Sequence, residues 1–539
     1  MSFSEHIYES NYNNLEDFEP WIPEGSSKKN LENIGGLGLA LYDNQVSKKP
    51  MNPIDSFHYD IHKKSGAICF PTYFNENLDN FLPILAKFKK IWFFKYFNQS
   101  VDILPDSVEE LRLGGNFSQT ITKYPSGLKN LVLFSDIQID NLPNLEVLHL
   151  LGNFINTPIN NLPDSIKEIY IGGDFNQPID NLPNSLTKLQ INDTYTSVCP
   201  FFRPEIRNLP NTITHLTIKT QLDKPIVLPD SLEYLEIHFD GNYLPKVLPP
   251  NLKVLKLLGD FNNSIEGILP EGLVELQFGP KFNSPLGNES GTFIPSTLKK
   301  LSNYSSNFGM YVFSQDINNL PDNIQEINLH FVKYFGTITK LPSNLKKFTI
   351  TNNTYPSDNK NILVIESFPS GIEEIDIFMQ DNISIPEIPD SCKILDLNII
   401  EDFAPKVLPN NLEVFRLNCT SIESLIKSNK TPYPVYDFPP TLIDLTIDEL
   451  DLRKTTLPTG LVELSINSKC WLINLPDTIE FLHLERVEHI DKLPNNIKKI
   501  YSHVSNQDLI EPLLNPNIEY KKTGLLERSY GVRSYYESI

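Results

Sequence analysis

An apolar residue followed by proline recurs about every twenty residues along most of this chain, and no other feature constrains its fold as strongly. Most of the spacings fall between 18 and 22 residues. A fixed period of this length is the signature of a repeat architecture, in which one unit cannot bury its own apolar face and stacked units can. The first residues of these anchors are Leu82, Leu104, Tyr124, Leu142, Leu162, Leu182, Leu209, Leu228, Leu248, Leu269, Ile294, Leu320, Leu341, Phe368, Ile388, Leu408, Phe438, Leu457, Leu475 and Leu493.

Each part of the period has a mechanical role. Proline fixes φ and lacks an N–H, which suits a corner before a strand, and the Asp, Asn or Ser that usually follows favours a turn. A leucine pattern ending in L-x-L comes next and predicts a short strand with one apolar face. A Gly, Asn or Asp group then turns the chain. A phenylalanine that we expect to point inward follows in several copies: Phe117, Phe154, Phe175, Phe261 and Phe282.

This pattern predicts a mainly β repeat solenoid, a right-handed coil similar to a leucine-rich repeat. The strands would stack into one long parallel sheet on the concave side. About ten residues separate a strand from the next anchor, which leaves little room for a crossover helix, so we expect irregular convex segments. We divide the chain into an N-terminal segment and solenoid cap at 1–81, about twenty repeats at 82–503, and a C-terminal cap or tail at 504–539.

The residues that close several coils resemble the FNIP repeat family, which is known from social amoebae and from giant viruses of amoebae. The matching stretches are FNQS at 97–100, FNQPI at 175–179, FNNSI at 261–265 and FNSPL at 282–286. The anchor also resembles the short LPxxL type of leucine-rich repeat. Some family members carry an F-box before the repeats, which implies a role in ubiquitination. Prolines and glycines punctuate residues 35–81 too densely for us to place an F-box there.

Composition excludes some classes of function. The formal net charge is −21, which disfavours a nucleic-acid binder because phosphate contacts need clustered Lys and Arg. The five cysteines are far apart without a C-x-x-C motif, so we expect reduced thiols. The stretch MSFSEHIYES lacks the apolar core of a signal peptide and no long apolar run suggests a membrane span, so we expect a cytoplasmic protein that does not bind membranes, in the host cytoplasm if it is viral.

Motifs for catalysis or metal binding are weak. His58 and His62 would share a helical face, but no further ligand cluster accompanies them, and we interpret them as structural. Cys470 beside Trp471 follows a repeat strand and is better explained as a core or convex thiol than as a nucleophile. We therefore predict no enzyme, with no catalytic, cofactor-binding or metal residues. An enzyme using the first 80 residues remains a rival hypothesis.

The residue inside each L-x-L, and the residue two before it, should project from the concave sheet in parallel columns. They vary in charge and size while the leucines do not, as expected for a framework with a variable display face. The alternative is that this polar sheet is merely solvated. The candidate partner-binding residues are Arg112, Tyr170, Gln190, Tyr234, Glu236, Lys256, Gln277, Asn328, Asp376, Asp396 and Arg416.

Five coils are lengthened, and their inserts should loop out. Two inserts are rich in aromatic residues, around Cys199–Phe202 and around Phe308–Phe313, and could either contact a partner or pack on the solenoid. The leading hypothesis is a non-enzymatic scaffold that presents its concave face or its inserts to a protein partner, possibly for ubiquitination. The alternative is a structural component of a virion or another large assembly, which would self-associate.

Overall fold

The fold was examined in a computed structural model of the 539-residue chain. The structure describes residues 18–20, 60–62, 65–152, 155–173, 175–191, 206–220, 222, 224–238, 244–303, 312–331, 336–352, 362–379, 382–399, 407–419, 436–448 and 450–523. The chain forms two compact units, 1–252 and 253–539, and each is described by itself.

The first unit is a stack of coils. Each coil contributes one short strand to a parallel sheet, and neighbouring strands pair in register. Leu111 of one coil lies beside Leu131 of the next, and Leu148 beside Ile169, with buried and half-buried residues alternating along each strand. Among the described residues of this unit, antiparallel pairing joins the first strands, β1 to β2 and β2 to β3. The elements are β1 (Phe18–Pro20), β2 (Asp60–His62), β3 (Ala67–Cys69), η4 (Leu78–Phe81), α2 (Leu82–Leu85), β4 (Lys90–Trp92), β5 (Glu110–Leu113), β6 (Asn130–Leu133), β7 (Val147–Leu150), β8 (Glu168–Ile171), β9 (Lys188–Ile191), β10 (His215–Ile218) and β11 (Tyr234–Ile237).

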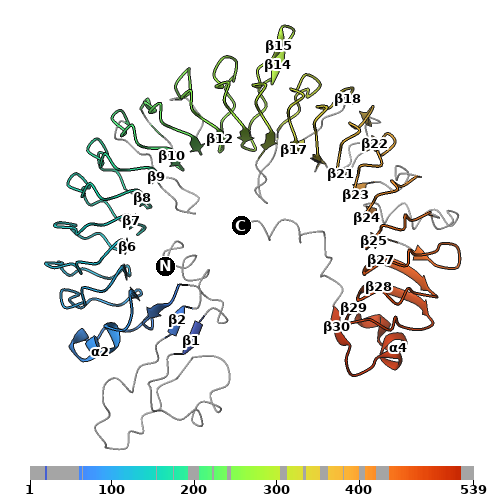
Figure 1. Ribbon diagram of the computed structural model, residues 1–539, viewed down its shortest axis with the longest axis horizontal. Helices are drawn as coiled ribbons and strands as arrows, with labels where there is room; N and C mark the ends of the chain where they lie inside the picture. Colours follow the sequence, from blue (N-terminus) through green and yellow to red (C-terminus); the bar gives the residue numbers. More distant parts are fainter. Residues whose placement is uncertain are drawn as a thin grey trace, which may run out of the picture. The chain divides into compact units, whose positions relative to one another are not determined.

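The second unit has the same architecture, and several of its strands are longer, such as β17 (Glu326–Phe331) and β27 (Glu463–Leu472). Its parallel sheet contains β12 (Val254–Leu257), β13 (Glu275–Phe278), β16 (Lys300–Asn303), β17 (Glu326–Phe331), β19 (Lys347–Asn352), β21 (Glu374–Met379), β23 (Ile394–Ile399), β24 (Val414–Cys419), β25 (Asp444–Ile447), β26 (Leu450–Asp451), β27 (Glu463–Leu472), β28 (Phe481–Ile490), β29 (Lys499–His503) and β30 (Glu519–Thr523). Within each unit the strands line the inner side of the curved stack and the turns lie outside (Figure 1).

Two small sheets accompany the turns of the second unit. The hairpin β14 (Gly287–Asn288) and β15 (Gly291–Thr292) is the looped-out insert of the lengthened coil that begins at Leu269. The strands β18 (Thr337–Ile338), β20 (Ile362–Ile365) and β22 (Asn382–Ser384) pair in parallel on successive coils. The structure therefore bears out the parallel β solenoid that the period predicts.

Regular helices are short and lie near the ends of the coil stack, within the residues that the structure describes. They are η4 and α2 before β4, and η6 (Val504–Asn506), α4 (Gln507–Ile510) and η7 (Glu511–Leu513) before β30. The expectation of convex segments without crossover helices is confirmed for the described coils. The anchor at Leu82–Pro83 differs from the expected extended corner, because it opens α2. Proline is tolerated there since the first turn of a helix leaves its N–H groups unpaired.

The leucines of the repeat form the core as predicted. Leu111, Leu189, Leu255 and Leu395 are all fully buried, and a second layer of aromatic rings fills the space under the turns. In the second unit Phe282 stacks on Phe278 at 3.7 Å and lies 6.3 Å from Phe313, between ring centroids. Phe313 thus packs in the core. Of the two alternatives given for the insert aromatics, contact with a partner or packing on the solenoid, this residue follows the second.

Several expectations fall on residues outside the described ranges. They concern the aromatics at 199–202 and 308–311, the inward position Phe154, His58, and the tail from 524 onward. For His62 only the backbone, as part of β2, is described.

The L-P-D-S signature of the anchors is explained by hydrogen bonds between successive coils. The N–H of Leu186 donates to the carbonyl of Pro183, which closes a tight turn. The hydroxyl of Ser165 donates to the carbonyl of Leu145 in the preceding coil at 2.7 Å, and the N–H of Ser126 donates to Oδ1 of Asp106 at 3.0 Å. These bonds satisfy backbone groups that a buried turn would otherwise leave unpaired.

The asparagine of the F-N signature makes a second ladder. The N–H of Asn283 donates to Oδ1 of Asn262 at 2.7 Å, and Asn283 in turn accepts from the N–H of Ser314 at 2.8 Å. The same arrangement joins Asn98 to Ser118 at 2.8 Å in the first unit. Each asparagine therefore binds the equivalent turn of the next coil, while its phenylalanine packs inside.

Asparagine also replaces the backbone where strands of unequal length meet. β16 ends at Asn303 while β17 continues, and the Asn303 amide donates to the carbonyl of His330 and accepts from its N–H, at 2.8 and 2.6 Å. Asn506 does the same beside β28, where its Oδ1 accepts from the N–H of Val487 at 3.0 Å and its Nδ2 donates to the carbonyl of Glu485 at 3.0 Å. Both side chains are buried.

Removing a ring from the aromatic layer should destabilise the second unit strongly. We expect Phe282→Ala to cost about 3–5 kcal/mol in the free energy of unfolding, because the cavity would lie among closely stacked rings. Chemical denaturation followed by hydrogen exchange would measure the loss and show whether it concentrates in neighbouring coils. Val407→Ala, at a side chain that is 73 % exposed, is the control and should change stability by less than about 0.5 kcal/mol.

Asn506, near the C-terminal end of the described residues, tests whether an asparagine side chain takes the place of missing backbone hydrogen-bonding groups. Asn506→Ala would leave the Val487 N–H and the Glu485 carbonyl without partners, and we expect a loss of about 1–3 kcal/mol. Leu509→Ala changes a partly exposed neighbour and should cost less. Equal effects of the two substitutions on thermal unfolding would contradict this role for the asparagine.

Candidate functional site

The concave face of the parallel sheet carries two columns of side chains. We call the residue between the two buried apolar positions of each L-x-L the inner column, and the residue two before it the outer column. All eleven predicted partner-binding residues belong to these columns and all are half-buried, while their leucine neighbours are fully buried. The sheet therefore holds polar side chains in register at a spacing of about 4.8 Å between strands.

At the start of the first unit, Arg112 is held by a tryptophan and a glutamate. Its Nε donates to Oε1 of Glu110 at 2.9 Å, and its guanidinium carbon lies 3.8 Å from the centroid of the Trp92 ring. Trp92 Nε1 donates to the same carboxylate at 2.8 Å. Sequence reasoning missed Trp92, because strand β4 has isoleucine and tryptophan where later strands have L-x-L.

Tyr170 lies in a stack of rings and cations. Its ring lies 4.3 Å from that of His149 and nearly parallel to it, and Nζ of Lys188 lies 5.0 Å from the ring centroid. Its hydroxyl donates to Glu168 at 2.6 Å, and Gln190 is its register neighbour on β9. Burial and the nearby Arg112 lower the pKa of His149 to about 4, so this imidazole is neutral at physiological pH.

Tyr234 and Glu236 form a unit on β11. The Tyr234 hydroxyl donates to Oε2 of Glu236 at 2.5 Å, and Nε2 of His238 lies 2.7 Å from Oε1. Burial alone would raise the pKa of Glu236, but the hydrogen bonds from His238 and Tyr234 outweigh it and lower the pKa to about 2. This carboxylate is therefore permanently charged and fixed in orientation.

In the second unit, Lys256 and Gln277 are register neighbours on β12 and β13. Asn328 lies on β17 between Ser302 and Thr349. Its Oδ1 is buried and makes no hydrogen bond within the part of the chain that the structure describes.

The strongest electrostatic feature of the concave face is a run of acidic side chains on β21 to β25. Asp376 and Asp396 are register neighbours, and Arg416 follows on β24. Arg416 lies 2.6 Å from Asp444 and 3.7 Å from Asp396, so its charge is divided between them. Burial, then Asp396 and Glu374, raise the pKa of Asp376 to about 7, and burial raises that of Asp396 to about 6 despite Arg416.

The longer strands of the second unit add a column that the L-x-L pattern did not predict. Thr351, Phe378, Asn398 and Asn418 occupy it on β19 to β24, in register. Nδ2 of Asn467 donates to Oδ1 of Asn418 at 2.6 Å. The signal was present in the sequence, because stretches such as EINLHF and EIDIFM keep alternating after the second apolar residue.

A further column of charges borders the concave face, at the residue immediately before each outer-column position. We call it the edge column, and backbone hydrogen bonds join its successive residues. Over part of its length its charges alternate in sign and pair across coils, Lys89 with Glu109 at 2.7 Å and Glu146 with Lys167 at 3.0 Å. In the second unit Lys346 pairs with Glu373 at 2.8 Å and Glu480 with Lys498 at 2.7 Å.

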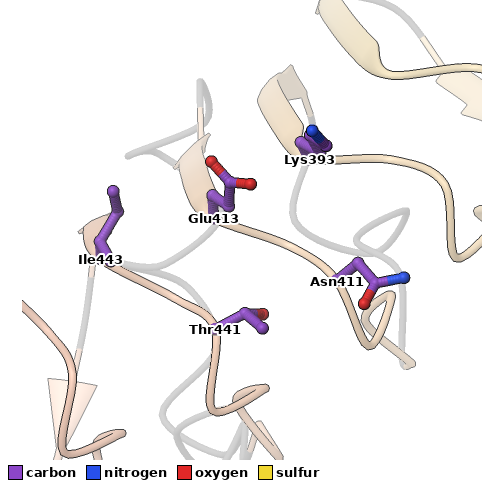
Figure 2. Close-up of a pocket in the computed structure, with 5 residues that line it drawn as sticks. All are labelled: Lys393, Asn411, Glu413, Thr441 and Ile443. Carbon is purple, nitrogen blue, oxygen red and sulfur yellow. The ribbon is translucent and has the colours of Figure 1, made fainter.

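In the second unit the run of alternating charges from Lys346 to Glu413 ends after Glu413. The next two edge-column residues are Ile443 and Val462, and Ile443 is 45 % exposed. A hollow of about 400 Å³ opens there, lined by Lys393, Asn411, Glu413, Thr441 and Ile443. Figure 2 shows the Glu413 carboxylate between Lys393 and Ile443 at the starts of three neighbouring strands.

The described residues form no cluster suited to metal binding, and three of their cysteines are buried. No group of three or more His, Cys, Asp and Glu side chains lies close enough to hold a metal ion in the ranges given above. Cys69, Cys392 and Cys470 are buried thiols, and burial raises the pKa of Cys392 and Cys470 to about 12. Cys470 is thus a core thiol, as interpreted. No helix among the described residues has the length and apolar character needed to cross a membrane.

Comparison with known proteins identifies the repeat. The FNIP Repeat family model matches residues 156–194, 242–281 and 261–302. No curated protein matches the chain. Among solved structures, the chain is similar to CroV588, described as a novel circular leucine-rich-repeat protein, with 18 % identity over 85 % of this chain and 99 % of that one and a TM-score of 0.40.

Two further structures are similar at the same level. YopM from Yersinia enterocolitica WA-314 is 19 % identical over 74 % of this chain and 82 % of its own, with a TM-score of 0.43. The Toll–Spätzle complex of Drosophila matches with 10 % identity over 86 % of this chain and 65 % of that chain, with a TM-score of 0.39.

The paired aspartates predict a specific dependence of stability on pH. Their pKa values are raised in the folded protein, so their contribution is most favourable below the unfolded value near 3.8 and is lost as the pH rises through about 6 to 7. We expect Asp376→Asn to raise the melting temperature at pH 8, by an amount corresponding to about 1 kcal/mol, and to change it little near pH 4. Melting curves across this range would measure the effect. Glu387→Gln, at an exposed acid, should show no such pH-dependent gain.

Proposed function

Starting from the premise that this chain carries FNIP repeats in a leucine-rich-repeat-like solenoid, we propose that it is a non-enzymatic scaffold that binds a protein partner through its concave face. The observation that carries the proposal is the contrast between columns. Buried positions repeat leucine and isoleucine from coil to coil, while the half-buried columns hold aromatic, basic, acidic and amide groups in fixed register. Solenoids commonly use such surfaces for recognition.

Preorganisation supports this function over a merely solvated sheet. Several display residues are fixed by neighbours before any partner arrives, as Arg112 is by Trp92 and Glu110, and Glu236 is by Tyr234 and His238. Side chains that are already ordered lose less conformational entropy on binding. Half-buried carboxylates that lie side by side, such as Asp376 and Asp396, would gain from a cationic group on a partner.

Two more specific roles are compatible with a scaffold of this kind, one in ubiquitination and one in a large assembly. A partner recognised in the cytoplasm could be a substrate for ubiquitination, and self-recognition would instead make the chain a structural component of an assembly. One experiment separates these outcomes. Tagged chain is recovered from its native cells with its partners, and the partners are identified by mass spectrometry.

The test uses a matched pair of variants in the second unit. Lys256→Glu with Gln277→Lys changes two register neighbours on the concave face. Lys281→Glu with Glu289→Lys changes two exposed residues of the turns that follow β13, and serves as the control. We expect a partner that the wild-type and control chains retain and that the concave variant loses by at least about tenfold, because a repulsive charge in an interface costs more than 1 kcal/mol.

The contrary results are equally defined. A partner retained by both variants would place recognition on the inserts or the ends of the solenoid. Recovery of the chain alone, with concentration-dependent association of the purified protein, would favour the structural role.

A further inference from the structure

In part of the chain the edge column follows a rule, the alternation of lysine and glutamate, and other residues break it at positions such as Thr187, Thr214, Val274, Gln325 and Ile443. Where the rule holds, a lysine and a glutamate alternate on successive coils and their charged atoms lie 2.7–3.0 Å apart, as in the Lys89–Glu109 and Glu146–Lys167 pairs. After Lys346, Glu373, Lys393 and Glu413, the next residue should be a lysine and is Ile443. The hollow beside Glu413 occupies the position of this missing lysine.

From this comparison we propose that the hollow formed by Glu413, Thr441 and Ile443 binds a lysine or arginine side chain of a protein partner. This proposal rests on the proposed function in one respect, namely that a protein partner supplies the side chain. The hollow itself lies beside the concave face and outside the inner and outer columns. The edge-column residues Glu109, Glu146, Glu373 and Glu480 each receive an ammonium group from an adjacent coil. Glu413 forms no such pair among the described residues, so a partner can supply the ammonium group.

The lining matches the two parts of such a side chain. The Glu413 carboxylate has no ion pair and no side-chain hydrogen bond among the described residues, and can accept from a cation. Ile443 is 45 % exposed and offers an apolar surface to the methylene stem, as lysine and arginine stems commonly pack on apolar surface. Lys393 also lines the hollow, on the other side of Glu413, so the incoming cation would share this carboxylate with it.

The polar residues below the hollow are already satisfied and would not compete for the cation. The Thr441 hydroxyl donates to the carbonyl of Leu412 at 2.7 Å, and the Asn411 amide donates to the carbonyl of Asp390 at 3.0 Å. The hollow of about 400 Å³ has room for one long side chain. Because exposed ion pairs are individually weak, this contact would add specificity to a larger interface rather than bind a partner alone.

The first test supplies the missing lysine within the chain. Ile443→Lys should place an ammonium group against Glu413 as Lys167 is placed against Glu146, and should raise the melting temperature by about 1 °C. The gain should disappear in 1 M salt and in the double variant with Glu413→Gln. Ile443→Met, a long side chain without charge, is the matched control. A gain that is equal with methionine, or that persists with Glu413→Gln, would overturn the proposal.

The second test supplies the side chain from solution to the full-length protein. N-acetyl-lysine methylamide should shift the methyl NMR signal of Ile443 in a saturable way, and its uncharged analogue N-acetyl-norleucine methylamide should not. Glu413→Gln should weaken the effect at least threefold. No shift at Ile443, or the same shift with both amides, would overturn the proposal.

A lysine of the chain itself is the competing occupant, and Lys427 and Lys430 belong to the same lengthened coil. If the amide bound only to the variant carrying Lys427→Gln and Lys430→Gln, the chain would fill its own hollow and the proposal would fail. None of these measurements involves the concave columns. Their failure would therefore leave the proposed scaffold function untouched, and loss of that function would not affect them.

Discussion

Register between neighbouring coils is the constraint on which the rest of this structure depends. A single coil has one four-residue strand and a few leucines, too little to bury an apolar face alone. Placed in register, Leu111 meets Leu131 and Ile169 meets Leu189, so that every coil completes its neighbour's core. A slip of one residue would turn every leucine outward, so the hydrophobic term itself fixes the alignment.

The polar signature residues protect this register where the backbone leaves the strands. Turn N–H and carbonyl groups are bound by the asparagine, aspartate and serine side chains of the adjacent coil, as in the Asn262–Asn283–Ser314 ladder. Where two strands differ in length, a buried asparagine such as Asn303 takes the place of the missing backbone. The conspicuous polar residues of the repeat are thus part of the framework, because a turn stacked between two others has little access to water.

The framework frees the concave columns to vary, and the consequences differ along the sheet. Stacked rings and paired charges fix the side chains around Tyr170 and Glu236, which suits preorganised recognition. The Asp376–Asp396 pair is held together by the sheet against its own repulsion, a local cost that the surrounding core can bear. At the edge of the sheet, lysine–glutamate pairs between coils favour correct stacking where they occur, and at Ile443 a carboxylate lies beside an exposed apolar surface instead. Such departures from the local rule are where function is expected.

The sequence by itself determined the period, the parallel strands, the buried leucines and phenylalanines, and which residues lie in the two display columns. It could do so because these features depend on spacing along the chain, and alternation in a strand fixes which side chains face the core. It did not determine that the anchor at Leu82 opens a helix, that strands such as β21 extend to six residues, or that Trp92 joins Arg112 and Glu110. It also did not reveal the paired charges of the edge column or the hollow at Glu413. Those depend on which side chains about twenty residues apart come within 3 Å of one another, and only the stacking of coils decides that.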